Sequence, residues 1–135
     1  MKIVKTRSAG QSMVEFALVF PLLALLLFGI IQYGFIFSAY MTLRHAANVT
    51  ARTVGLAGVS AVDANAVAQN AVTPMLDSTK LGAVVVNTTT VSTANDAYSV
   101  QLTYNLPLII KFVVPGATGN TLVLNARAVY RKEGS

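Results

Sequence analysis

The stretch FALVFPLLALLLFGIIQYGFIF, from Phe16 to Phe37, decides the architecture of this chain. It opens a longer segment, Phe16 to Leu43, that contains no charged side chain. Because about 20 helical residues cross a bilayer core of about 30 Å, this stretch is long enough to span a membrane. Aromatic side chains, which favour the lipid–water interface, gather toward its far end at Tyr33, Phe35, Phe37 and Tyr40. We therefore predict a transmembrane helix over about 16–40.

The basic residues before this helix indicate its orientation. Lys2, Lys5 and Arg7 are three of the ten Lys and Arg residues in a chain of formal net charge +5. Basic residues flank membrane helices on the cytoplasmic side, so we expect a cytoplasmic amino terminus and an extracytoplasmic head. Since the basicity is local, nucleic acid is not an expected partner.

The overall composition argues against a soluble enzyme. Of 135 residues, 54% are hydrophobic and only 11% are charged. Without Cys the chain has no disulfide, thiolate zinc site or cysteine nucleophile. His45, the only imidazole, lies in an Ala-rich segment, and Asp63, Asp77, Asp96 and Glu133 are scattered singly. We expect no catalytic residue, no metal and no cofactor.

Two ordinary interpretations of the amino-terminal segment remain open. A secretory signal peptide also starts with basic residues, but its apolar region is typically about 7–15 residues long and ends at a small-x-small site. An uncleaved membrane anchor is the more serious alternative. Neither explains Glu15, because a carboxylate at the mouth of an apolar helix costs free energy unless it has a partner or reaches the headgroups.

The segment SAGQSMVEF, from Ser8 to Phe16, resembles the cleavage site of type IV prepilins. In that pattern a short basic leader ends in Gly, and a Glu stands fifth in the mature chain, directly before the apolar helix. Gly10 and Glu15 have this spacing. The resemblance implies that a prepilin peptidase removes a leader of residues 1–10 and that the mature chain starts at Gln11. Many type IVa pilins carry Phe where this chain has Gln11, so methylation of the new amine is an open question.

The chemistry of these residues suits such processing and subsequent assembly. Gly10 lacks a Cβ, so a protease cleft beside the bilayer can hold the main chain closely. Cleavage creates an ammonium at Gln11, four positions from Glu15, where the two charges meet on one helix face or between neighbouring helices. Desolvation makes such a pair costly, so we expect Gln11, Glu15 and Phe16 to set assembly register rather than stability. Pro21 removes one helical hydrogen bond, which predicts a kink or a melted turn.

A longer segment, VEFALVFPLLALLLFGIIQYG from Val14 to Gly34, resembles the opening of TadE-like pseudopilins, minor components of tight-adherence (Tad/Flp) pili. The segments TLRHAANVTARTVGLAG, VQLTYNLPLII and TLVLNARAVYRKE resemble them more loosely. The resemblance implies a minor pilin-like subunit of the bacterial inner membrane that takes part in assembling an adhesive pilus. Its implied partners are the prepilin peptidase, other pilin or pseudopilin subunits, the assembly platform and the lipid bilayer. An uncleaved single-pass envelope protein that binds a partner through its outer head is the alternative.

Beyond the membrane the sequence predicts that the helix continues, giving one long helix over 11–57. A stripe of small and apolar side chains suits burial under the head: Leu43, Ala46, Ala47, Thr50 and Val54. Arg44 and Arg52 are expected to face water or lipid phosphates. Gly55 and Gly58 are expected to end the helix.

The head, 58–135, is predicted to complete an α+β fold. Ser60 and Asp63 resemble a capping box for a second helix from Val62 to Leu76, which Pro74 ends or kinks. Alternation of period two then predicts three antiparallel strands laid on the outer half of the long helix: Ala83 to Val91, Tyr98 to Leu106 and Thr121 to Arg131.

The connections between these strands carry the remaining expectations. Asn95 and Asp96 mark the first turn, and Gly116 to Asn120 mark the second. The segment LPLIIKFVVP, from Leu106 to Pro115, is the most apolar outside the membrane helix. We favour core or a strand continuation for it; an exposed patch for a partner subunit or the outer bilayer face is the alternative.

Overall fold

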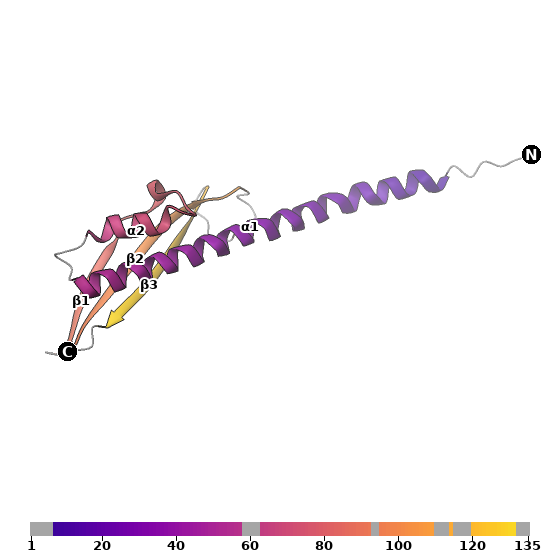
Figure 1. Cartoon of the computed structure of the whole chain (residues 1–135). Coiled ribbons are helices and arrows are strands. Elements are labelled where there is room, and N and C mark those ends of the chain that lie inside the picture. Colours follow the sequence, from indigo (N-terminus) through magenta and orange to yellow (C-terminus); the bar gives the residue numbers. More distant parts are fainter. Residues whose placement is uncertain (1–6, 58–62, 93–94, 110–113, 115–119, 132–135) are drawn as a thin grey trace, which may run out of the picture. The chain divides into compact units, whose positions relative to one another are not determined.

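A computed structural model describes residues 7–57, 63–92, 95–109, 114 and 120–131 of the chain. The elements follow in the order α1 (Arg7–Ala57), α2 (Ala64–Val72), the 3-10 helix η1 (Ser78–Lys80), β1 (Val85–Ser92), β2 (Asn95–Pro107) and β3 (Thr121–Arg131) (Figure 1). The predicted α+β class is confirmed: a long apolar helix, a second helix and a three-stranded antiparallel sheet. Two units divide the chain, Met1–Gly34 and Phe35–Ser135.

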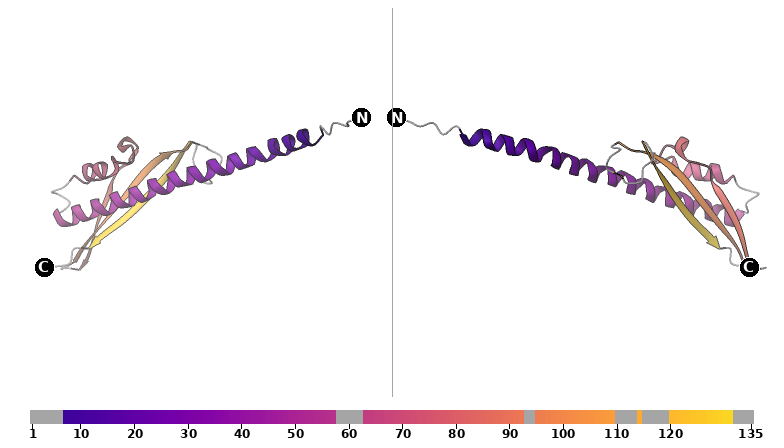
Figure 2. Two further views of the ribbon diagram at one scale, coloured as in Figure 1. Left: turned by 45° about the vertical axis from the view of Figure 1, so that its right-hand side comes forward. Right: turned by 180° about the vertical axis from the view of Figure 1, so that it is seen from behind.

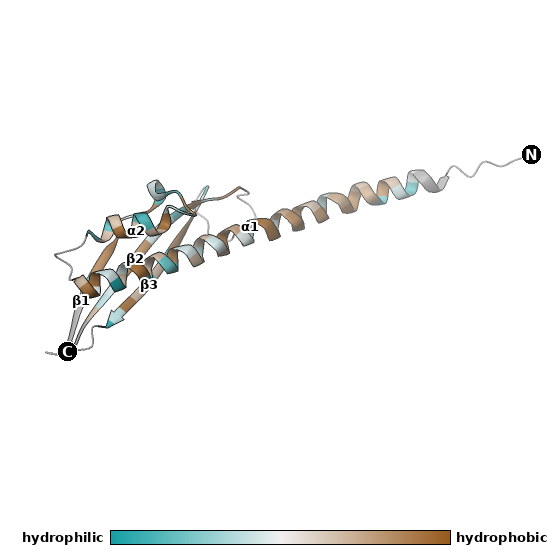
Figure 3. Ribbon diagram, viewed as in Figure 1, coloured by the Kyte–Doolittle hydropathy of each residue, from teal (hydrophilic) through white to brown (hydrophobic). Residues whose placement is uncertain are grey.

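The described part of the first unit is helical and exposes its apolar side chains. Leu18 is 77% exposed and Leu22 is 70% exposed, and the large side chains around them are similarly bare. In Figure 3 the ribbon of this part of α1 is mostly brown, with teal near its amino-terminal end. Among the described residues, Gly10–Ala57 is the one helix long and apolar enough to cross a membrane, with a mean hydropathy of 2.6 over its best window. Since no protein covers these side chains, this helix fits a single-pass membrane protein.

The second unit is built around an antiparallel sheet of order β1-β2-β3. Val86 pairs with Val100, and Val100 pairs with Ala128, so the three strands share one register across the sheet. Alternate residues of the central strand, Val100, Leu102 and Tyr104, are buried on one face. This is the period-two pattern that the sequence predicts for a sheet with one covered face.

The turn predicted at Asn95 and Asp96 is wrong. Both residues belong to β2, where Asn95 pairs with Ser92 and Asp96 pairs with Thr90. Turn-forming residues can enter a strand because their local preference is small compared with the backbone hydrogen bonds of the ladder, here formed with β1. The register shifts between Thr90 and Ser92, so the pairing is irregular next to the connection. The second predicted turn lies outside the described residues, apart from Asn120.

One core joins the Phe35–Ala57 part of α1, α2 and the sheet. The two helices lie on the same face of the sheet (Figures 1 and 2). The predicted stripe of α1 is buried in full, with each of its five side chains 0% exposed: Leu43, Ala46, Ala47, Thr50 and Val54. Ala126 and Ala128 of β3 join the same cluster. Small residues on both elements let the helix approach the strands closely. The buried hydroxyl of Thr50 is hydrogen-bonded, because it donates to the Ala46 carbonyl at 2.8 Å.

The second helix is shorter than predicted, and its cap differs. Asp63 is itself the N-cap, because its Oδ1 accepts from the backbone N–H groups of Asn65 at 3.0 Å and Ala66 at 3.3 Å. The capping-box role of Asp63 at the third helical position is therefore wrong, and Ser60 lies outside the described residues. The helix ends at Val72, two residues before Pro74, as expected from the missing proline N–H.

The apolar segment after β2 is described only in part. Leu106 and Pro107 continue β2, Leu108 is buried, and its N–H donates to the Asn120 carbonyl at 2.9 Å. Ile109 is 75% exposed. The first residues of the segment therefore continue the strand and enter the core, and residues 110–113 and 115 lie outside the described ranges.

Gly55 does not end α1; it is a packing position inside the helix. The helix runs on to Ala57, and Gly55 is buried. A Cβ at this position would lie 2.7 Å from Cε1 of Tyr130 and nearer still to Cδ1 of the same ring. The absence of a side chain thus makes room for the tyrosine of β3. Gly58 lies outside the described residues.

We predict that Gly55→Ala destabilises the head by about 1–3 kcal/mol, because the added methyl group overlaps the Tyr130 ring. Chemical unfolding of the full chain in detergent, followed by near-ultraviolet circular dichroism of the tyrosines, measures the change. Gly34→Ala is the matched control, since nothing lies within 4 Å of its Cβ. Equal unfolding midpoints for the two variants would contradict the close packing of Gly55 on Tyr130.

Candidate functional site

The predicted processing and assembly residues lie in the first turns of α1. Gly10, Gln11, Glu15 and Phe16 are all exposed. The helix begins at Arg7, four residues before the expected start at Gln11. The peptide bond between Gly10 and Gln11 is therefore in helical backbone, and a Cβ at Gly10 would meet no atom within 4 Å.

Gln11 and Glu15 face each other across one helical turn. The Nε2 atom of Gln11 donates to Oε1 of Glu15 at 3.4 Å, a long contact between two exposed side chains. The backbone nitrogen of Gln11 stands about 6 Å from that of Glu15 along the axis. The spacing thus brings residues 11 and 15 to one helix face, as the sequence predicts.

Phe16 begins an aromatic pair that points away from the axis. Its ring and that of Phe20 have centroids 5.4 Å apart and planes tilted by 33°. Pro21 follows directly and lies inside α1, which continues on both sides of it. Because proline has no N–H, the carbonyl four residues before it loses its usual helical donor. The kink expected at Pro21 stays a prediction.

Comparison with known families matches this region. Residues 10–52, about a third of the chain, match the family described as TadE-like protein. Over these residues the chain is similar to that family. The resemblance noted in the sequence is confirmed there, and the match begins at Gly10 and ends inside the part of α1 that packs on the sheet. No curated protein and no solved structure matches the chain.

The TadE-like family is a family of pilus-associated proteins rather than enzymes. Within the described ranges, no three His, Cys, Asp or Glu side chains gather into a group that could hold a metal ion. His45 is exposed on α1, as expected for a surface residue.

Asp77 is a carboxylate with a lowered pKa and a structural role. Two hydrogen bonds from Thr79 lower the pKa of Asp77: its hydroxyl donates to Oδ1 at 2.7 Å and its backbone N–H at 3.0 Å. Lys80 adds a weaker electrostatic contribution at 3.5 Å from Oδ2. A general acid at neutral pH needs a raised pKa, so Asp77 is a turn-forming carboxylate that caps η1.

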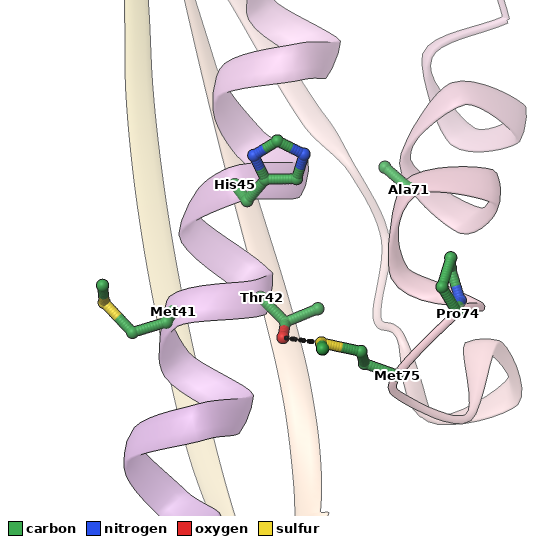
Figure 4. A pocket seen from close by; sticks show the side chains of 6 residues that line it. All are labelled: Met41, Thr42, His45, Ala71, Pro74 and Met75. Carbon is green, nitrogen blue, oxygen red and sulfur yellow. Dashed lines mark hydrogen bonds between the residues drawn. The ribbon is translucent and has the colours of Figure 1, made fainter.

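A hollow of about 370 Å³ lies between α1 and α2, lined by Met41, Thr42, His45, Ala71, Pro74 and Met75. Two methionines and a histidine suggest a soft-metal site at first sight. Figure 4 shows that Met41 and Met75 point to different sides of Thr42, whose hydroxyl donates to the Met75 sulfur at 3.4 Å. The three side chains do not converge on one point.

A second hollow, of about 270 Å³, is lined by Met41, Arg44, His45 and Asn48. The guanidinium carbon of Arg44 lies 5.8 Å from the centroid of the Tyr40 ring. Sequence reasoning predicted the exposure of Arg44 but missed this grouping. The spacing of Tyr40 and Arg44, one helical turn apart, was the available signal. All four residues that line this hollow belong to α1.

We predict that Thr79→Ala raises the pKa of Asp77 toward its ordinary value of 3.8, because the substitution removes the hydroxyl that donates to this carboxylate. Since the folded pKa is lowered, the ionised carboxylate stabilises the turn above pH 3.8, and this is lost as the pH falls through the folded value. The chemical shift of the Asp77 carboxyl carbon, followed through a pH titration by nuclear magnetic resonance, measures this pKa. Thr79→Ser keeps the hydroxyl and should retain most of the lowering; an unchanged midpoint in Thr79→Ala would contradict the assignment.

Proposed function

We propose that the chain is a minor pilin-like subunit, or pseudopilin, cut by a prepilin peptidase after Gly10 and used in assembling a Tad/Flp-type adhesive pilus. The observation that carries this proposal is α1 itself. Most of its large apolar side chains between Met13 and Phe37 are exposed, it matches the TadE-like family from Gly10, and Glu15 stands just before the apolar stretch. A bundle of identical or related helices would cover these side chains when the subunit leaves the lipid.

The proposed cleavage requires local unwinding of α1. A protease grips an extended main chain, whereas the bond after Gly10 is helical in the uncut chain. Glycine costs about 1 kcal/mol in a helix relative to alanine, so the turn around Gly10 opens more readily than its neighbours. Gly10 thus serves both the opening of the helix and the close approach of the enzyme.

After cleavage, the charges at the tip of the rod would be rearranged. Removal of residues 1–10 takes away Lys2, Lys5 and Arg7 and leaves an ammonium on Gln11. The Gln11 side chain already reaches Glu15 in the uncut chain. Within lipid, a charge that lacks its partner is penalised, so a Glu15 carboxylate would be driven toward the amine of its own or a neighbouring helix. This pairing favours one axial position of adjacent subunits.

The proposed placement follows from the same residues. The leader lies in the cytoplasm, the membrane part of the helix (about 16–40) crosses the bacterial inner membrane, and residues 58–135 form the extracytoplasmic head. Proposed partners are the prepilin peptidase, other pilin or pseudopilin subunits and the assembly platform of the inner membrane.

We predict that Gly10→Leu leaves the leader attached, because the isobutyl group obstructs the backbone grip on which cleavage depends. Intact-mass spectrometry of the chain from pilus-producing cells should show Met1 retained in the variant and Gln11 as the first residue of the unmodified protein. Gly34→Leu, an equal change at another open helical glycine, should be processed normally. Normal processing of Gly10→Leu would refute the cleavage assignment. An unmodified chain that keeps Met1 would favour the uncleaved envelope protein.

We predict that Glu15→Ala is processed but lowers pilus output by about tenfold or more, because the amine of Gln11 loses its charge partner in a low-dielectric setting. Immunoblots separate mature from uncut chain, and electron microscopy counts pili. Glu15→Gln preserves the shape without the charge and should fail similarly, whereas Glu15→Asp should retain part of the function. Normal pilus numbers in Glu15→Gln would show that the carboxylate has no role in register.

A further inference from the structure

Beyond Tyr40, one side of α1 carries polar side chains that the sheet does not cover. Leu43, Ala46 and Ala47 are buried in the core, while Arg44, His45, Asn48 and Arg52 are exposed. The change from apolar to polar is abrupt along this side. Phe37 is 66% exposed and Met41 is 53% exposed, and His45 follows one turn after Met41.

The polar side chains nearest to the apolar stretch line a hollow on one side of α1. The hollow has a volume of about 270 Å³, and Met41 forms its apolar side. Nitrogen donors come from Arg44, His45 and Asn48. No carboxylate lines it. Among the described side chains, the ion pair joins Lys80 to Asp77. Arg44 therefore has no described carboxylate within salt-bridge distance. The guanidinium carbon of Arg44 lies over the Tyr40 ring, and this contact uses none of the N–H donors of Arg44.

The position of the hollow along the helix corresponds to lipid headgroups. At about 1.5 Å per residue, Arg44 and His45 stand about 5–6 Å beyond Met41 along the axis. A headgroup layer on one side of a bilayer is about 5–8 Å thick. With Tyr40 and Met41 at the edge of the hydrocarbon, where aromatic residues are favoured, the donors of the hollow reach the depth of the phosphates.

We propose that Arg44, His45 and Asn48 bind the phosphate of an anionic phospholipid, whose acyl chains lie along Met41 and Phe37. The guanidinium of Arg44 donates to phosphate oxygens in a forked geometry, with the imidazole and the amide as further donors. A free phosphate ion would use the same donors but would gain nothing from the apolar side chains beside them. The inference depends on the membrane helix alone and not on processing or pilus assembly.

Spin-labelled lipids test this site in the full chain. The protein is reconstituted in phosphatidylcholine bilayers, and electron spin resonance measures the motionally restricted fraction of labelled phosphatidylglycerol relative to labelled phosphatidylcholine. We expect a preference for phosphatidylglycerol of about fivefold, the effect of one basic residue near a membrane surface, which Arg44→Gln abolishes. Arg52→Gln is the matched control, because it removes the same charge about 12 Å farther along the exposed side of α1. It should keep the preference.

The other outcomes would overturn the proposal. Equal losses in Arg44→Gln and Arg52→Gln would show diffuse attraction by basic residues instead of a site. Loss of the preference on adding inorganic phosphate at constant ionic strength would show that the hollow takes free phosphate. Unchanged lipid preference in Arg44→Gln together with fewer pili would assign this side of α1 to a neighbouring subunit. Failure of the Gly10 and Glu15 variants to behave as expected leaves the lipid measurement unaffected.

Discussion

The fold depends on one helix, α1, whose first part exposes apolar side chains and whose second part buries its side chains in the core of the head. From Met13 to Phe37 most of the side chains of α1 are large, apolar and exposed, and water is a poor solvent for them. From Ala39 onward the side chains facing the sheet are small and fully covered. The helical backbone satisfies its own hydrogen bonds in both settings, so a single element serves lipid on one part and a packed core on the other. The head then needs only the remaining residues to enclose that second part.

The core of the head is formed by small side chains in close approach. Ala46, Ala47 and Ala51 of α1 lie in the same cluster as Ala126 and Ala128 of β3, with Tyr104 and Leu102 as its largest buried members. At Gly55 the absence of a side chain likewise lets the Tyr130 ring pack directly against α1. A chain with no cysteine has no covalent support for so small a core, so its stability rests on this fit.

Periodicity predicted the elements well because burial imposes it directly. The apolar run, the buried stripe of α1 and the three alternating strands were all recognisable, since each places one kind of side chain on one face. The local features were harder. Asp63 caps α2 itself, Gly55 is inside α1, and Asn95 and Asp96 pair in β2, because tertiary packing and strand pairing outweigh the weak preferences of single residues. The proposed processing residues rest on resemblance. The hollow beside Arg44 is lined by α1 alone, so the helical spacing of Met41, Arg44, His45 and Asn48 was a signal that the sequence analysis did not use.

The alternating burial along β3 means that its two faces tolerate substitution to different degrees. Leu124, Ala126 and Ala128 point into the core, while Val123, Asn125, Arg127 and Val129 lie on the side that no helix covers. A larger residue at the inner alanines would force the sheet away from α1, whereas exchanges on the outer side leave the interior untouched. The uncovered side of the sheet can therefore change in sequence, and in the charge that it presents, without loss of the fold.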